Sequence, residues 1–195
     1  PTHHTLEDIS LLRTVPKTEI LGPSDSIMAA AFADRMIEQQ TPAYVRLDRK
    51  LQDVKYSDSE RFEEGFKELN RGSDIAIVTT GNMVDRALAF NSQEFNDNLG
   101  VIDIYRLKPL NSDLNKTLCR YKAIISLEEH FLAGGLGSII AEHITDNDLP
   151  LKLRRLGVND AFVYEYGGRR NIQEKVGLGV EDVKRTVEKL KGLIL

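Results

Sequence analysis

Cysteine is almost absent from this sequence, since Cys119 is the only one among 195 residues. A single cysteine excludes an internal disulfide, and a reducing, cytoplasmic location is therefore expected. Long apolar runs are also missing. The longest, such as residues 75–78, have the length of a strand and fall far short of the roughly 20 residues that cross a bilayer. Because Pro1 is followed by polar residues, we expect neither a secretory signal nor association with a membrane.

An excess of positive charge is lacking as well. The 26 basic and 30 acidic residues give a net charge of −4, which argues against nucleic acid as a partner. The pairs Arg154-Arg155 and Arg169-Arg170 are interpreted as solvated ends of elements. With 41% apolar and 29% charged residues, the composition is that of a globular protein. The length allows one domain and part of another.

The first part of the chain predicts the order helix, strand, helix, strand. Thr5 with Asp8 approximates a capping box for the first helix, and Ser24 or Asp25 can cap the second. Four such elements make half of an α/β domain. Residues 1–49 are therefore assigned to a partial domain that begins inside its own fold.

The rest of the chain divides into a linker and a complete domain. Residues 50–73 are rich in charge and poor in apolar side chains, which predicts a linker with a short helix around residues 62–69. From residue 74 onward, apolar strands alternate with helices. This alternation is typical of a mostly parallel sheet covered on both faces, so residues 74–195 are predicted to form a three-layer α/β/α domain.

A glycine-rich turn follows the third strand of this domain. The strand ends in Glu128-Glu129-His130, and residues 133–138 lead into a helix. A strand, a glycine turn and a helix N-terminus can cradle phosphate, but these glycines match neither the dinucleotide nor the P-loop pattern. The favoured interpretation is a tight turn that lets the helix pack closely on the sheet. No metal site is predicted, because adjacent residues of a strand point to opposite faces.

Two other segments carry side chains suited to chemistry. His3 and His4 precede the first helix, and imidazole can pass a proton near neutral pH. A tag remnant or a frayed terminus is the alternative. Arg46 and Arg49 follow a strand, at the edge where ligands gather in open α/β sheets, and are candidate phosphate ligands. A surface pair of arginine with Asp48 fits the spacing equally well.

These segments occur together in the order found in the transketolase superfamily. Pro1-Thr2-His3-His4, followed by residues 8–25, resembles the second half of its pyrimidine-binding domain. The segment from Arg46 to Arg49 resembles the strand end that closes that domain, and residues 128–138 resemble the C-terminal domain. The resemblance covers essentially the whole chain and points to the C-terminal subunit of two-subunit transketolases.

The resemblance implies an activity and roles for particular residues. It implies transfer of a two-carbon ketol unit between sugar phosphates, with thiamine diphosphate and Mg²⁺ as cofactors. His3 is expected to contact substrate hydroxyls near the reacting carbons as the catalytic residue. Arg49 is expected to bind the terminal phosphate, and His4 is a further substrate-side residue. Asp48 departs from the small or proline residue common in relatives, and its negative charge is expected to weaken phosphate binding.

The resemblance also implies what other parts must supply. The family's glutamate that activates the aminopyrimidine, and its magnesium and diphosphate ligands, match no position in residues 1–195. We therefore expect an N-terminal diphosphate-binding domain or subunit as partner, homodimer contacts through the C-terminal domain, and an inactive isolated fragment. The alternatives are a deoxyxylulose-phosphate synthase, the beta subunit of a 2-oxoacid dehydrogenase, or a non-catalytic dimerisation module.

Overall fold

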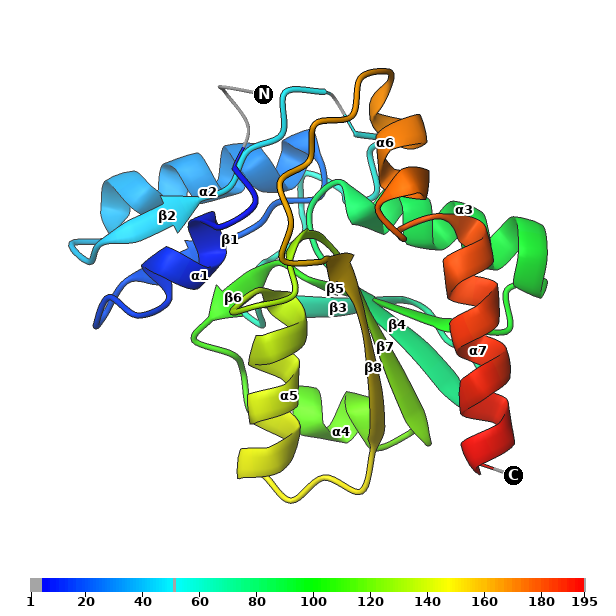
Figure 1. Cartoon of the computed structure of the whole chain (residues 1–195). Coiled ribbons are helices and arrows are strands. Elements are labelled where there is room, and N and C mark those ends of the chain that lie inside the picture. The colour runs from blue at the N-terminus through cyan, green and yellow to red at the C-terminus, as the bar shows by residue number, and fades with distance from the viewer. Residues whose placement is uncertain (1–4, 51, 195) are drawn as a thin grey trace.

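The computed structural model describes residues 5–50 and 52–194, which form two sheets surrounded by helices (Figure 1). The larger sheet has the strand order β3-β5-β4-β7-β8. Four of its strands are parallel to their neighbours, whereas β3 runs antiparallel to β5 at one edge. The five strands are β3 (Phe66–Asn70), β4 (Ile75–Thr79), β5 (Gly100–Ile104), β7 (Ala123–Phe131) and β8 (Lys152–Val158).

Helices cover both faces of this sheet, which confirms the predicted three-layer α/β/α fold. Successive residues of the central strand β4 point to opposite faces. Ile75 and Ile77 pack in the cluster that includes residues of α3 and α7, whereas Ala76 and Val78 pack in the cluster that includes residues of α4 and α5. The helices are α3 (Met83–Phe95), α4 (Leu114–Leu118), α5 (Leu136–Asp146), α6 (Arg169–Lys175) and α7 (Val180–Ile194).

The N-terminal segment folds in the predicted order of helix, strand, helix and strand. Asp25 caps the second helix as expected, because its Oδ1 accepts a hydrogen bond of 2.9 Å from the Met28 N–H. The predicted capping box was wrong, since Glu7 occupies the cap position of the first helix and its side chain makes no capping bond. The elements are α1 (Asp8–Leu12), β1 (Glu19–Leu21), α2 (Ser26–Glu38) and β2 (Ala43–Val45).

A short strand from the second part of the chain completes the smaller sheet. β6 (Arg106–Lys108) follows β5 directly and pairs antiparallel with β1, which gives the order β2-β1-β6. β1 and β2 are parallel. The two sheets are therefore joined by the chain between β5 and β6, and the N-terminal segment uses a strand from beyond residue 74 to extend its sheet. The pattern of residues 101–105 did not predict this division into two strands.

The short helix predicted around residues 62–69 was wrong. Residues 66–70 form β3, and Phe66 pairs with Ile104 at the edge of the larger sheet. The charged side chains that suggested a linker suit an edge strand, where charge discourages pairing with another chain. Glu68, for example, accepts hydrogen bonds from Arg120 and from the Tyr121 hydroxyl at 2.5 Å each. β3 forms because it pairs with β5, a contact between distant segments that local sequence does not predict.

The segment between the two sheets is packed rather than loose. Tyr56 is 4% exposed, and its ring meets that of Phe62 edge to face with centroids 5.3 Å apart. Phe62 also packs edge to face on Phe32 of α2 and on Tyr105. Such contacts add to the stabilisation from apolar burial. The part of the chain that the structure describes contains no helix long and apolar enough to cross a membrane.

The glycine turn before α5 brings the helix against β7, as the favoured interpretation predicted. A Cβ atom on Gly135 would overlap the Glu128 carboxylate and lie 2.6 Å from His130 Nδ1. A Cβ atom on Gly137 would lie 2.6 Å from Ser126 Oγ. Real Cβ atoms do not approach other atoms so closely. The two glycines are therefore required by the distance between helix and strand.

Replacing Gly135 with alanine should lower the free energy of unfolding by about 1–3 kcal/mol, because the added methyl group forces buried neighbours apart. Gly192 in α7 offers a matched control, since no atom lies within 4 Å of its Cβ position. Alanine there should leave stability unchanged or raise it by up to about 1 kcal/mol. Urea denaturation of the two variants and the wild-type protein provides the measurement. Equal stability of the two variants would contradict the packing argument.

Candidate functional site

Charged side chains from both sheets meet where β2, β4 and β7 end. Arg46 follows β2, Asn82 follows β4, and Glu129 lies near the end of β7. β4 and β7 are parallel, so their carboxyl ends share one edge of the larger sheet. Open α/β sheets bind their ligands at such edges.

Arg46 links the two sheets and is not available to a phosphate. Its Nε donates to Asp8 Oδ2 at 2.8 Å. Its Nη2 donates to the carbonyl oxygens of Thr5 and Glu129 at 3.1 Å each. The alternative interpretation, a surface pair with Asp48, was wrong for Arg46. Its partner is the buried Asp8 on α1, which spacing alone did not indicate.

Asp8 and His130 meet beneath this arginine. Asp8 Oδ2 also accepts a hydrogen bond of 2.7 Å from the Tyr44 hydroxyl, and burial together with this carboxylate raises the pKa of Tyr44 to about 12. Asp8 Oδ1 lies 3.6 Å from His130 Nε2, and neither atom has a hydrogen-bond partner among the described residues. His130 is fully buried, and this burial lowers the pKa of its imidazole.

Glu128 occupies the N-terminus of α5. Its carboxylate accepts hydrogen bonds from the backbone N–H groups of Leu136 at 2.6 Å and Gly137 at 2.8 Å. Burial raises the pKa of Glu128 to about 7, and the two backbone bonds act in the opposite direction. A helix N-terminus is an anion site, and here the protein's own carboxylate fills it. The turn at residues 133–138 is therefore not a phosphate cradle.

Glu129 points to the other face of β7 and binds Arg169. The Arg169 Nε lies 3.0 Å and 2.9 Å from the two carboxylate oxygens of Glu129. The Nη1 of the same guanidinium contacts Asp48 at 2.9 Å and 2.6 Å. Burial alone would lower the pKa of Arg169, but the bonds to Glu129 and Asp48 raise it instead. Asn82 adds a further donor to Glu129 at 2.5 Å.

Arg49 lies beside this bridge with its side chain exposed. Over residues 5–50 and 52–194, Arg49 forms no side-chain hydrogen bond and no ion pair. The neighbouring Asp48 Oδ1 accepts a hydrogen bond of 2.8 Å from the Lys50 N–H, which fixes the turn on both sides of Arg49. Of the two arginines predicted as phosphate ligands, only Arg49 therefore keeps its guanidinium available.

Arg169 was expected to be one of a pair of solvated basic residues at the end of an element. It does begin α6 and its side chain is 43% exposed, but it also bridges two carboxylates from different elements, which the pattern did not predict. Asp48 lies 121 positions earlier in the chain, so no local spacing could indicate the pair. His3 and His4 lie outside the described residues, and their predicted roles stay predictions.

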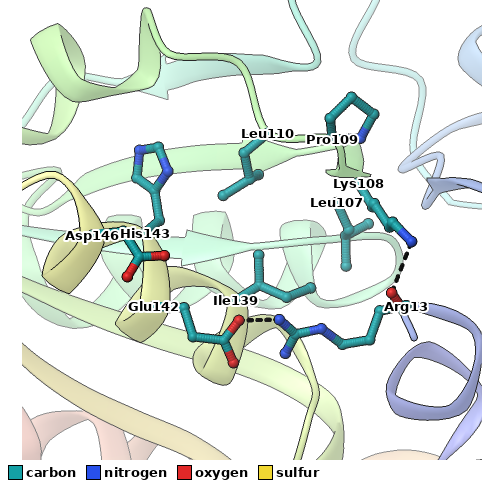
Figure 2. A pocket seen from close by; sticks show the side chains of 9 residues that line it. All are labelled: Arg13, Leu107, Lys108, Pro109, Leu110, Ile139, Glu142, His143 and Asp146. Atoms are coloured by element: carbon teal, nitrogen blue, oxygen red, sulfur yellow. Dashed lines mark hydrogen bonds and ion pairs between the residues drawn. The ribbon is translucent and has the colours of Figure 1, made fainter. Parts of the chain in front are cut away.

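A separate pocket of about 250 Å³ lies between α1, β6 and α5 (Figure 2). Two of its charged groups, Arg13 and Glu142, pair with each other, and Lys108 Nζ donates to the Arg13 carbonyl oxygen at 2.8 Å. Arg49 is not among the residues that line it. Within the described ranges, no group of three or more histidine, cysteine, aspartate or glutamate residues is placed to hold a metal ion.

A buried carboxylate joins the sheets at a second place. Asp103 of β5 is fully buried, and its Oδ2 accepts hydrogen bonds from the Ser24 hydroxyl at 2.5 Å and the Tyr56 hydroxyl at 2.9 Å. Burial raises the pKa of Asp103 to about 7, although the two hydroxyl bonds favour the charged form. The carboxyl group therefore binds its proton more tightly in the folded protein than in the unfolded chain.

Replacing Asp103 with asparagine should flatten the pH dependence of stability between about pH 4 and pH 7. Since the folded-state pKa is raised from 3.8 to about 7, the stabilisation from this group is present at low pH and lost as the pH rises through that window. Asparagine keeps an acceptor for both hydroxyls and does not titrate. The difference in unfolding free energy between the two proteins should change by about 2–4 kcal/mol across the window. If the unfolding free energies of the two proteins, measured by urea denaturation, change in parallel with pH, the raised pKa of Asp103 is contradicted.

Comparisons with known proteins agree with the resemblance. A family model described as the transketolase C-terminal domain matches residues 65–183. A transketolase C-terminal section of Methanocaldococcus jannaschii is 30% identical over 196 residues, which is 97% of this chain and 61% of that protein. A 6-deoxy-6-sulfo-D-fructose transketolase subunit of Clostridium sp. strain MSTE9 is 31% identical over 193 residues, 97% of this chain and 59% of that one. The chain thus spans about three fifths of these relatives.

Solved structures show the same likeness. A split-gene transketolase, described as an inactive beta4 tetramer, superposes with a TM-score of 0.89 at 31% identity. That match covers 100% of this chain and 64% of the other. A transketolase from Campylobacter jejuni, 15% identical with a TM-score of 0.73, shares the fold over 97% of this chain and 29% of its own. Because the family model covers more than half of its residues, this chain belongs to the transketolase C-terminal domain family.

Proposed function

We propose that this chain is part of a thiamine-diphosphate-dependent enzyme that transfers a two-carbon ketol unit between sugar phosphates. The likeness to the split-gene transketolase carries the proposal, because it extends over 100% of this chain at 31% identity. It includes both the N-terminal segment with Arg49 and the three-layer domain. The relatives named as transketolase subunits support the same reaction class.

The described residues do not fit a thiamine diphosphate site. The N-terminus of α5, the natural place for a diphosphate, is filled by the Glu128 carboxylate. The described residues also offer no cluster of metal ligands for Mg²⁺. We therefore assign the cofactor to an N-terminal diphosphate-binding domain or subunit. The enzyme that forms when the polypeptide carrying this chain joins that partner is called the assembled enzyme below.

Arg49 is the residue of this chain to which we assign the substrate phosphate. Its guanidinium is exposed at the end of β2, where no other described residue engages it. A guanidinium offers a planar fork of donors that matches the oxygens of a phosphate group. His3 and His4 are proposed to contact the substrate hydroxyls, with His3 nearer the reacting carbons. A cytoplasmic location is part of the same proposal.

Two other functions have specific support. A 1-deoxy-D-xylulose-5-phosphate synthase of Thermus thermophilus is 28% identical over 195 residues, 95% of this chain and 30% of that enzyme. This branch of the superfamily is the second candidate. The third is a non-catalytic module that associates with its own copies through the C-terminal domain. The split-gene transketolase that resembles this chain is itself described as an inactive tetramer.

The assembled enzyme should transfer a ketol unit from a ketose phosphate to an aldose phosphate only when thiamine diphosphate and Mg²⁺ are added. Release of carbon dioxide from a 2-oxoacid donor, with condensation onto an aldose phosphate, would instead assign the synthase branch. Absence of any cofactor-dependent turnover would overturn the proposed function and favour the module.

Within that assay, Arg49→Ala should raise KM for a phosphorylated acceptor about 10- to 100-fold, because a charge-assisted bidentate contact is lost. The KM of Arg49→Lys should lie between those of Arg49→Ala and the wild-type enzyme, since the lysine ammonium keeps the charge but lacks the planar pair of donors. Arg71 is a matched control, an exposed arginine just before β4 at the opposite edge of the sheet. An equal effect of Arg71→Ala would contradict a local role for Arg49.

The chain of residues 1–195 alone should not bind thiamine diphosphate tightly. Isothermal titration calorimetry with the cofactor and Mg²⁺ should give no saturable heat, because Glu128 fills the helix N-terminus where a diphosphate would lie. The same titration of the assembled enzyme should give one site per active centre. Stoichiometric, magnesium-dependent binding to the isolated chain would contradict the assignment of the cofactor to the partner.

A further inference from the structure

Asp48 creates an electrostatic problem for the site assigned to Arg49. Asp48 is the residue immediately before the arginine that is to bind a phosphate. An uncompensated negative charge close to a phosphate site repels a phosphate dianion and competes for its arginine. The structure compensates this charge from a distant part of the chain, because Arg169 Nη1 lies 2.9 Å and 2.6 Å from the two Asp48 oxygens.

The compensating guanidinium is itself held in place. Arg169 directs Nε and Nη2 to Glu129, and Glu129 accepts a further bond from Asn82 after β4. The Arg169 guanidinium thus pairs with two carboxylates, that of Asp48 on one side and that of Glu129 on the other. Both acidic side chains are largely buried, at 15% and 17% exposure. The Arg169 side chain is 43% exposed, so each pair joins a largely buried carboxylate to a partly solvated guanidinium.

The bridge also joins separate parts of the fold. Arg169 is the first residue of α6, whereas Asp48 follows β2 and Glu129 lies in β7. Figure 1 shows α6 beside the segment that follows β2. Asp48 in turn accepts the Lys50 N–H at 2.8 Å, so the turn that carries Arg49 is held from both sides.

We propose that Arg169 is a positioning residue for phosphate recognition, which pairs with Asp48 so that the Asp48 charge does not oppose a substrate phosphate at Arg49. This inference rests on the proposed function, because it takes Arg49 as the phosphate ligand. Arg169 acts through Asp48 and does not itself touch the substrate. In this proposal Arg49 binds the phosphate, and Arg169 offsets the negative charge of Asp48 by pairing with it.

Steady-state kinetics of the assembled enzyme provide the test, with a phosphorylated aldose acceptor and its unphosphorylated counterpart. Arg169→Ala should raise KM for the phosphorylated acceptor roughly five- to tenfold, with kcat and the unphosphorylated KM within about twofold of wild type. Adding Asp48→Asn to Arg169→Ala should restore the phosphorylated KM, because position 48 then carries no charge, whereas Glu129 lacks Arg169 in both variants. Lys175→Ala is the control, since it removes a more exposed ion pair of α6, with Glu165, and should change neither KM.

Three results would overturn the proposal while leaving the proposed function intact. They are an unchanged KM in Arg169→Ala, an equal rise of KM for both acceptors, and failure of Asp48→Asn to restore the phosphorylated KM. The last two would indicate a general structural role for the bridge. Thermal denaturation of each variant separates loss of fold from loss of recognition, and the rescue measurement keeps the test decisive if Arg169→Ala is destabilised.

A second measurement keeps the two proposals apart if the assembled enzyme shows no ketol transfer. The Nε resonance of Arg49, assigned from its loss in Arg49→Lys, is followed by NMR while inorganic phosphate is added to the protein. Weaker saturation in Arg169→Ala than in the wild-type protein, restored by Asp48→Asn, would support the positioning role even though the reaction class is wrong. Identical titrations in all three proteins would overturn it.

Discussion

Buried carboxylates need donors, and the donors to Asp103 come from across the junction between the two sheets. Asp103 in β5 takes its hydrogen bonds from Ser24 and Tyr56, which belong to the N-terminal half of the chain. Asp8 in α1 accepts hydrogen bonds from Tyr44 and Arg46 through Oδ2, whereas its Oδ1 has no hydrogen-bond partner among the described residues. Leaving such a group without a partner costs several kcal/mol. Polar pairs such as those of Asp103 therefore join segments that are far apart in the chain.

The same constraint explains the chemistry of the strand ends. Arg46 donates hydrogen bonds to Asp8 and to two carbonyl oxygens, and Glu128 accepts hydrogen bonds at the N-terminus of α5. Both residue types are ones that a search for ligand sites would select. Their engagement leaves Arg49 exposed after β2, next in the chain to Asp48, whose carboxylate pairs with Arg169. Our functional proposal therefore rests on Arg49, a side chain that these internal pairs leave without a partner among the described residues.

The three-layer fold was predictable because apolar strands such as residues 75–79 alternate regularly with helices, and burial of both faces leaves a clear pattern. The strand at residues 66–70 was not predictable, because its residues do not alternate between apolar and polar side chains. It forms through pairing with β5, which is distant in the chain. β6 was also missed, since three residues joined directly to β5 look like its continuation. In each failure, contacts between distant segments outweighed local propensity.

The site was predictable only in part. The glycines before α5 indicated close packing, which the structure confirms. Arg49 is exposed after a strand as its position suggested, and its phosphate role stays a prediction. Arg169 gave no signal, because its partners are far away in the chain and a basic pair normally lies in solvent. The histidines His3 and His4 rest on resemblance alone, since they lie outside the described residues.

The account places the substrate phosphate on Arg49, with Arg169 held on Asp48 and Glu129 throughout. A crystal structure of the assembled enzyme with a bound sugar phosphate tests this most directly. The account predicts the terminal phosphate against the Arg49 guanidinium, while Arg169 keeps its contacts to both carboxylates. A phosphate bound by Arg169 with Asp48 released, or bound away from the end of β2, would contradict it.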